Sequence, residues 1–338
     1  MNRAMSTIST HREMIRHGEF HLTRKKLKNK KMKKILIATE KPFAKSAVDG
    51  IKKILEAAGF ETVLLENYAQ KAELLQAASD ADAIIIRSDI VDADVLNAAK
   101  NLKIVIRAGA GYDNIDLATA TAKGVVAMNT PGQNSNAVAE LAMGMMVFAA
   151  RNNFNRSSGT ELKGKKLGLH AFGYVSKAVA TIAHGFGMEI YAFDPFVDKG
   201  AIEAEGIHYV DDVNELYKTC QYVSLHMPVN AQTKKSVNFD LLSLMPKGAT
   251  LVNTARKEVI AEEGLLQMFA ERADFKYISD VEPDCKSLIA EKFSGRFYFT
   301  LKKMGAQTSE ANNNAGLAAA RQIVDFFTKN DTTFQVNK

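Results

Sequence analysis

Short apolar runs alternate with amphipathic segments along the chain from residue 32 onward. The runs are rich in Ile, Val and Leu, which is typical of strands buried in a parallel sheet. The segments between them, such as 44–58 and 92–99, carry apolar residues at helical spacing. This alternation predicts an α/β fold with helices on both faces of the sheet. The expected strands are 35–38, 62–65, 83–86, 104–106 and 125–127, then 167–169, 188–193, 208–210, 222–225, 250–252, 277–279 and 297–299.

A long apolar helix interrupts this pattern at residues 136–150, with Ser135 as its expected N-cap. The strand pattern restarts at Leu167, so we expect two doubly wound parallel-sheet domains. The last expected helix, 309–328, follows the final strand of the second unit. We expect it to return to the first domain, which makes that domain discontinuous. The predicted boundaries are 32–130 plus 303–330 for the first domain and 131–302 for the second.

The net charge of +6 over 338 residues is concentrated at the start of the chain. Residues 1–31 contain nine Lys or Arg and two acidic residues, which leaves −1 for the remainder. Because residues 32–338 are nearly neutral, we expect no nucleic-acid partner. We expect residues 1–31 to be a disordered extension or an over-long start with Met32 as the initiator. An organelle transit peptide is the alternative.

Composition adds two further exclusions. No apolar run reaches the roughly 18 residues that a membrane span needs. Cys220 and Cys285 lack metal-like spacing and are expected to be reduced thiols. We therefore expect neither a membrane partner nor a bound metal.

A βαβ unit with a dinucleotide fingerprint begins at Leu167. Its first strand leads into a turn, and its second strand ends in Asp194. The three positions of G-x-G-x-x-G are occupied by Ala171, Gly173 and Ser176. Gly173 keeps the position at which the backbone approaches the pyrophosphate, and the other two are the smallest substitutes.

The remaining features of this unit specify the ligand. The N–H groups of Tyr174 and Val175 are expected to face the pyrophosphate at a helix N-terminus. The Ser176 hydroxyl could help to cap this helix. The Asp194 carboxylate would accept from a ribose 2′-OH and repel a 2′-phosphate, which favours NAD over NADP.

Arg256 lies just past the apolar strand 250–252. Ligands of doubly wound sheets bind at the carboxyl ends of the strands. A guanidinium at this position could hold a carboxylate with two hydrogen bonds.

Several ordered motifs give the chain a specific resemblance. It resembles the NAD-dependent D-2-hydroxyacid dehydrogenases, and among them most closely the phosphoglycerate dehydrogenases, from residue 32 to about 330. The resemblance implies a flavodoxin-like substrate domain, a Rossmann NAD domain, NAD as cofactor, a cytoplasmic location and a homodimer or homotetramer. The motifs are IIIRSDIVDADVLNAAKNLKIVIRAGAGYDNID (84–116), MNTPGQNSNAVAELAMGMM (128–146), GTELKGKKLG (159–168), LHMP (225–228), LVNTARKEVI (251–260) and MGAQTSEA (304–311).

The same resemblance assigns roles to single residues. Arg256 corresponds to the arginine that binds the substrate carboxylate, and Asp280 to the acid that holds the nicotinamide carboxamide. The implied cofactor contacts are Ala110, Gly173, Tyr174, Val175, Asp194, Met227, Pro228, Thr254, Ala255 and Asp280. The implied substrate contacts are Arg87, Ser88, Arg107, Ala108, Gly109, Asn134 and Arg151, with Arg87, Arg107 and Arg151 around a phosphate.

The chain departs from the family pattern at the catalytic positions. The histidine that normally precedes Gly-Ala is absent, and Lys303 aligns with it. The segment is one residue longer, so Lys302 is the other candidate. A lysine can act as acid or base where its surroundings lower its pKa. Glu282 fits the family's Glu-Pro signature in a shortened loop, and the link from Arg151 to residue 159 is also shortened.

The resemblance implies NAD-dependent oxidation of a small phosphorylated 2-hydroxy acid, 3-phospho-D-glycerate, to 3-phosphohydroxypyruvate, a step of serine biosynthesis. One alternative is a reductase of glyoxylate, hydroxypyruvate or another 2-keto acid. A second is an NAD-sensing binding protein with weak catalysis. Because the sequence ends soon after the last expected helix, we also expect no regulatory domain and no feedback by serine.

Overall fold

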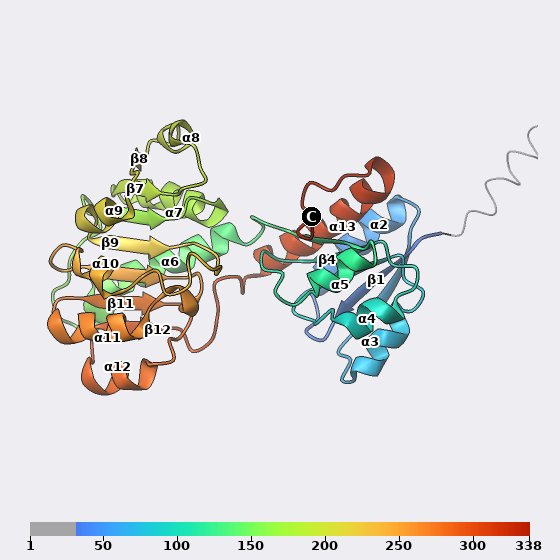
Figure 1. The fold of residues 1–338 in the computed structure, drawn as a ribbon, viewed down its shortest axis with the longest axis horizontal. Helices are drawn as coiled ribbons and strands as arrows, with labels where there is room; N and C mark the ends of the chain where they lie inside the picture. Colours follow the sequence, from blue (N-terminus) through green and yellow to red (C-terminus); the bar gives the residue numbers. More distant parts are fainter. Residues whose placement is uncertain (1–31) are drawn as a thin grey trace, which may run out of the picture.

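The structure, a computed structural model, describes residues 32–338, so the expectations for residues 1–31 lie outside the described residues. Figure 1 shows two lobes, which the chain joins twice: between β5 and α6, and between β12 and α13. Within residues 32–338, no helix combines the length and apolarity needed to cross a membrane.

The first domain is a five-stranded parallel sheet with strand order β2-β1-β3-β4-β5. This is the flavodoxin-like order, as expected. Alternate residues of β1 enter the apolar clusters on opposite faces of the sheet, Leu36 on one and Ile37 on the other. The elements are β1 (Lys34–Thr39), α2 (Lys45–Ala57), β2 (Glu61–Glu66), α3 (Lys71–Ala78), β3 (Ala83–Ile86), α4 (Ala93–Ala98), β4 (Ile104–Arg107), α5 (Leu117–Ala122), β5 (Val126–Asn129) and α13 (Ser309–Lys329).

The helix α13 returns to the first domain from the end of the chain, which confirms the discontinuous architecture. Ala319, Ala320 and Ile323 of α13 share a buried cluster with Ile51 of α2. A Cβ at Gly316 would lie 2.8 Å from Ile51 Cδ1, so this glycine lets the two helices approach closely.

The residues after α13 cover the edge of the first sheet. Val336 N–H donates to Ala127 O at 2.9 Å. The buried Asn337 side chain accepts from Ala127 N–H at 2.9 Å and donates to Val125 O at 2.9 Å. These contacts satisfy backbone groups of β5 that an open edge strand would leave unpaired.

The second domain is a seven-stranded parallel sheet with strand order β12-β11-β10-β9-β6-β7-β8. Its chain order reverses between β6 and β9, which is the Rossmann arrangement extended by one strand. The elements are α6 (Ser135–Ala150), η1 (Asn152–Phe154), β6 (Lys166–His170), α7 (Tyr174–Gly185), β7 (Glu189–Phe193), α8 (Lys199–Glu203), β8 (His208–Tyr209), α9 (Val213–Thr219), β9 (Tyr222–Leu225), α10 (Phe239–Ser243), β10 (Thr250–Asn253), η2 (Lys257–Val259), α11 (Glu262–Glu271), β11 (Lys276–Ser279), α12 (Lys286–Lys292) and β12 (Phe297–Phe299).

One local expectation is wrong. Ser135 is not the N-cap of α6 but its first residue, with only 7% of its surface exposed. Asn134 occupies the N-cap position and makes no capping hydrogen bond. The helix begins one residue early because Ser135 packs inward, where its hydroxyl cannot reach the exposed N–H groups of the first turn.

Candidate active site

The dinucleotide turn lies at the carboxyl end of β6, where the strand order of the second sheet reverses. Ala171 adopts φ +79°, the left-handed conformation that normally requires glycine. A Cβ at Gly173 would meet no atom within 4 Å, so the space in front of this backbone is open. The turn therefore keeps the geometry of the glycine fingerprint although it has only one of the three glycines.

Ser176 stabilises this turn rather than capping the helix. Its side chain is fully buried, and its hydroxyl donates to Ala171 O at 2.6 Å. The N–H groups of Tyr174 and Val175 lie in the first turn of α7, which has no side-chain cap. Such a helix start offers donors to an anion.

Asp194 follows β7 and lies directly beside the dinucleotide turn. Its Oδ2 accepts from Phe172 N–H at 2.7 Å and its Oδ1 from Phe196 N–H at 2.8 Å. The half-buried carboxylate is therefore fixed next to the dinucleotide turn, as its expected contact with a ribose requires.

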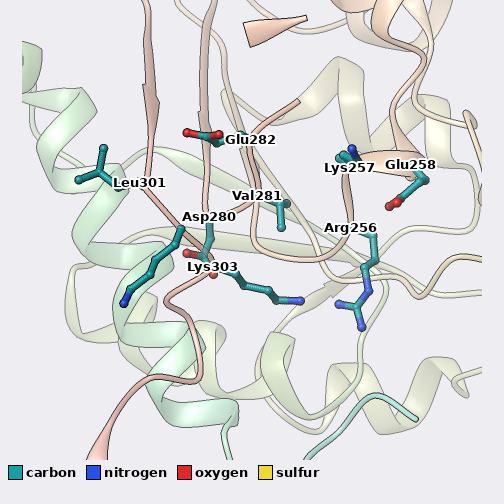
Figure 2. Close-up of a pocket in the computed structure, with 9 residues that line it drawn as sticks. Arg256, Lys257, Glu258, Asp280, Val281, Glu282, Leu301 and Lys303 are labelled. Atoms are coloured by element: carbon teal, nitrogen blue, oxygen red, sulfur yellow. The ribbon is translucent and has the colours of Figure 1, made fainter. Parts of the chain in front are cut away.

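Arg256 follows β10 and is oriented by Asn253. The Asn253 side chain accepts from Ala255 N–H at 2.9 Å and donates to Arg256 O at 3.0 Å. The Arg256 guanidinium lines a cavity of about 310 Å³, which Figure 2 shows. Thr254 and Ala255, two of the implied cofactor contacts, are the buried residues of this loop.

Lys303 extends into the same cavity toward Arg256 (Figure 2). The residue is exposed overall, but partial desolvation in the cavity lowers the pKa of its amine. The cations of Arg256 and Arg107 lower this pKa further, and the carboxylates of Asp280 and Asp113 oppose the shift. The lowered pKa makes the neutral amine, the form that can accept a proton, easier to reach than in an ordinary lysine.

Glu282 lines the same cavity, but its carboxylate is directed to another partner. Its carboxylate forms an ion pair with Lys286, one helical turn along the chain. Figure 2 shows the Glu282 side chain directed away from Lys303 and Arg256. The short loop before Pro283 leaves Glu282 at the rim of the cavity.

Asp280 lies at the carboxyl end of β11 with 1% of its surface exposed. Its Oδ1 accepts from the Thr300 hydroxyl at 2.9 Å and from Met304 N–H at 2.7 Å, and its Oδ2 accepts from Gly305 N–H at 2.7 Å. Its carboxylate is thus engaged by the segment that leads back to the first domain.

The first domain contributes a cluster of positive charge. Arg107, at the end of β4, donates through Nε to Arg87 O at 3.0 Å. Burial lowers the pKa of the Arg107 guanidinium, and the nearby cations of Arg256 and Arg87 lower it further. Mutual repulsion of this kind is relieved when an anion binds between the cations.

Gly109 is essential to this arrangement. Its φ is +153°, and a Cβ there would lie 1.6 Å from Arg107 Nη1. Ala108 is buried beside it, and Ala110 accepts from the Asn129 amide at 2.5 Å through its carbonyl. The loop 108–110 is therefore shaped around the Arg107 guanidinium.

Arg87 already has several partners. Its guanidinium donates to Lys41 O at 3.0 Å, to Pro42 O at 2.9 Å and to Asn312 Oδ1 at 2.6 Å. These contacts leave few of its N–H groups for a phosphate.

The remaining predicted residues are spread around the two domains. Ser88 is exposed after Arg87, Asn134 precedes α6, and the buried Met227 and exposed Pro228 follow β9. Arg151 lies at the opposite end of α6 from Asn134. Because a helix of 16 residues is about 24 Å long, α6 separates Arg151 from the arginines of the first domain.

Sequence reasoning missed three acidic residues near the site. Asp113 Oδ2 lies 3.7 Å from Arg256 Nη2, within a motif that was recognised only for its backbone. Glu258 lines the cavity two residues after Arg256. Asp89 is buried and accepts from Arg87 N–H at 3.1 Å and from Tyr68 OH at 2.7 Å. Proximity to the arginines along the chain was the only available signal for Asp89 and Glu258.

Comparisons with known proteins agree with this geometry. The family model described as D-isomer specific 2-hydroxyacid dehydrogenase, catalytic domain, matches residues 37–337. A solved structure of NAD+-bound 3-phosphoglycerate dehydrogenase from Entamoeba histolytica has 47% sequence identity and a TM-score of 0.81, and the match covers 91% of this chain and 99% of that one.

Two curated relatives carry different names. D-3-phosphoglycerate dehydrogenase of Methanocaldococcus jannaschii is 37% identical over 80% of this chain, which spans 54% of that protein. Hydroxypyruvate reductase of Thermotoga maritima is 34% identical over 78% of this chain and 90% of that protein. The chain thus spans about half the length of the phosphoglycerate dehydrogenase but most of the reductase.

Proposed function

The chain belongs to the D-isomer specific 2-hydroxyacid dehydrogenases, and we propose that it oxidises 3-phospho-D-glycerate to 3-phosphohydroxypyruvate with NAD. The observation that carries the proposal is the meeting of Arg256 and Lys303 in one cavity, with the charge of Arg107 close enough to act on both. Oxidation of a negatively charged 2-hydroxy acid needs a group that binds its carboxylate and a group that accepts a proton. Additional positive charge is needed to bind a phosphate on the same substrate.

The second domain fits NAD on its own geometry. The open space at Gly173 admits a pyrophosphate, and the first turn of α7 supplies N–H donors. Asp194, fixed beside the turn, would accept from the ribose hydroxyls. When bound, NAD would supply the acceptor for the hydride that leaves C2 of the substrate.

The reaction then needs two groups of this chain. Arg256 would hold the substrate carboxylate and stabilise negative charge on the C2 oxygen. Lys303, as a neutral amine, would take the proton of the C2 hydroxyl as the hydride departs. The 2-keto acid and a protonated Lys303 result, and the reverse reaction returns this proton to the carbonyl oxygen. Glu282 has no step in this scheme because its carboxylate pairs with Lys286.

The phosphate would lie on the side of the first domain. Arg107 would contribute most, because burial and the cations of Arg256 and Arg87 destabilise its charge until an anion binds. Its guanidinium also packs directly against the backbone of Gly109. The similarity to two phosphoglycerate dehydrogenases supports the same choice. A role in serine biosynthesis, a cytoplasmic location and a homodimer or homotetramer belong to this proposal as implications of the resemblance.

The test is NADH oxidation by the purified protein with phosphohydroxypyruvate, hydroxypyruvate and glyoxylate as separate substrates. We expect kcat/KM for phosphohydroxypyruvate to exceed that for hydroxypyruvate by about 10-fold or more, and Arg107→Gln to remove this preference. Equal use of both compounds by the wild type would contradict the phosphate pocket. Binding of NADH without turnover of any keto acid would favour the NAD-sensing alternative.

A reductase of hydroxypyruvate is the second candidate. It is favoured by the main-chain and Asn312 acceptors that already occupy Arg87. The Thermotoga relative supports it as well. In that case Arg107→Gln should change turnover of hydroxypyruvate little, because that substrate carries no phosphate.

A further inference from the structure

The segment that crosses from the second domain to the first is held by one carboxylate. Three donors of this segment converge on Asp280: the Thr300 hydroxyl, Met304 N–H and Gly305 N–H, at 2.9, 2.7 and 2.7 Å. The Thr300 hydroxyl also lies 3.0 Å from Asp280 O. Asp280 and Thr300 are 1% and 2% exposed, so these bonds are shielded from water.

The contacts bracket residues 301–303. Thr300 precedes this arch and Met304 follows it, while Leu301 at its top is 95% exposed. The arch contains the extra residue that distinguishes this segment from the family pattern. It therefore has little packing of its own, and its position depends on the anchors at its two ends. Lys303 is the residue next to the second anchor.

Gly305 locks the second anchor from the other side. A Cβ at this position would lie 2.9 Å from Asp280 Oδ2 and 3.2 Å from Val138 Cγ2. Val138 belongs to α6, the helix that follows the other connection between the domains. Gly305 is therefore packed between the Asp280 carboxylate and α6.

The capacity of the carboxylate limits what else it can bind. A carboxylate has about four acceptor positions, and three are occupied by the crossing segment. Asp280 lines the cavity, but only 1% of its surface is exposed. A nicotinamide carboxamide would have to share a group that the chain already uses.

We infer that Asp280 is a positioning residue, which holds the arch 301–303 so that the Lys303 amine stays beside Arg256. The inference rests on the proposed function, in which Lys303 moves the proton. It differs from the role that the resemblance implies, because Asp280 acts here through the protein chain rather than on the cofactor.

The experiment uses two variants and one control. Asp280→Asn removes the charge and places amide hydrogens opposite N–H donors, whereas Thr300→Val removes one anchor and keeps the charge. The control Thr219→Val removes a hydroxyl that bonds to Glu215 on α9, away from the cavity. Circular dichroism checks that each variant is folded. If Asp280→Asn does not fold, the comparison of Thr300→Val with the wild type tests the inference.

Kinetics and cofactor binding separate positioning from carboxamide binding. We expect kcat to fall by about 10-fold or more in both variants, because small displacements of a catalytic group are costly. The Kd of NADH, measured without substrate by fluorescence, should stay close to that of the wild type and of Thr219→Val. A Kd that rises in Asp280→Asn while Thr300→Val behaves like the wild type would overturn the inference.

The titration of Lys303 gives a readout that needs no turnover. Reductive ¹³C-methylation followed by NMR reports lysine pKa values, and Lys303→Arg identifies the signal. Asp280 and Asp113 raise the pKa of Lys303, while desolvation, Arg256 and Arg107 lower it. If the arch moves away from Arg256 and the cavity, the pKa of Lys303 rises in Thr300→Val. An unchanged pKa in Thr300→Val, with a lower one in Asp280→Asn, would mean that Asp280 acts by charge alone and would refute positioning.

The NMR titration also separates a failure of the proposed function from a failure of the inference about Asp280. A wild type that turns over none of the 2-keto acids would refute the proposed function. The shift of the Lys303 signal in Thr300→Val would still decide whether Asp280 positions the arch.

Discussion

The Ser176 hydroxyl donates a hydrogen bond to Ala171 O at 2.6 Å, across a turn in which Ala171 takes φ +79°. Two substitutions in the dinucleotide fingerprint are therefore linked: the alanine at the first position is in a strained conformation, and the serine at the third position binds its carbonyl. An isolated alanine in this conformation costs about 1–2 kcal/mol.

This link predicts opposite effects of two substitutions on stability. Ala171→Gly should raise the free energy of unfolding by about 0.5–1 kcal/mol, because glycine adopts a positive φ without strain. Ser176→Ala should lower it by about 1 kcal/mol through the lost buried hydrogen bond. Urea denaturation measures both. Ala204→Gly is the control and should lower stability, because Ala204 has φ −62° and is not strained. If Ala171→Gly also lowered stability, Ala171 would not be strained in the wild type.

The close approach of Gly109 to Arg107 predicts a specific loss of substrate binding. A methyl group at residue 109 would displace the Arg107 guanidinium, since the Cβ would lie 1.6 Å from Nη1. We expect Gly109→Ala to raise the KM of the acid substrate by about 10-fold or more with the Kd of NADH unchanged. Gly124→Ala is the matched control, because Gly124 has φ +65° and no atom near its Cβ position. An equal KM in both variants would argue against the displacement.

The ion pair between Glu282 and Lys286 predicts a small effect at a position that the family pattern marks as catalytic. Glu282→Gln should change kcat/KM by less than about threefold, because the carboxylate is directed to Lys286 and away from Lys303 and Arg256. Loss of the exposed pair itself should cost little stability. Steady-state kinetics with phosphohydroxypyruvate measures the effect. A loss of about 10²-fold or more would show that Glu282 turns into the cavity during catalysis.

The surroundings of Lys303 predict the pH dependence of the reaction. Oxidation needs the neutral amine, so its rate should rise with pH and level off above the pKa of Lys303. Desolvation and the cations of Arg256 and Arg107 place that pKa below the ordinary value of about 10.4 for lysine. Reduction needs the ammonium form, so its rate should fall over the same pH range.

The neighbouring lysine provides the control for this profile. Lys303→Ala should lower kcat by about 10²–10⁴-fold and abolish the inflection, whereas Lys302→Ala should keep both. Loss of the inflection in Lys302→Ala with its retention in Lys303→Ala would assign the proton transfer to Lys302.

Much of the architecture follows from local patterns. The apolar runs predict every strand of residues 32–338 to within two residues at each end, for example Ala83–Ile86 and Tyr222–Leu225 without any shift. This agreement arises because strands of a parallel sheet are buried on both faces, so that their sequences are continuously apolar. The start of α6 was misplaced, since a serine before an apolar helix suits both a capping and a buried position.

The carboxyl ends of the strands also indicated most of the candidate site. Arg256, Arg107, Gly173 and Asp194 each follow or end an apolar run, and the topology places each of them at the carboxyl ends of the strands of its own sheet. The sequence by itself therefore determined the fold class, the dinucleotide turn and the arginines, because these depend on periodicity and short-range order.

Only the tertiary structure decided how the side chains are used. The partner of each side chain depends on which donors and acceptors lie within reach in the folded chain. This decided that Glu282 pairs with Lys286 and that Ser176 binds Ala171 instead of capping a helix. It also decided that the Asp280 carboxylate accepts from the protein chain. Thr300 and Gly305 lie 20 and 25 residues from Asp280, and Asp113 reaches Arg256 from the other domain. Contacts over such separations arise from packing between elements, which no local pattern in the chain records.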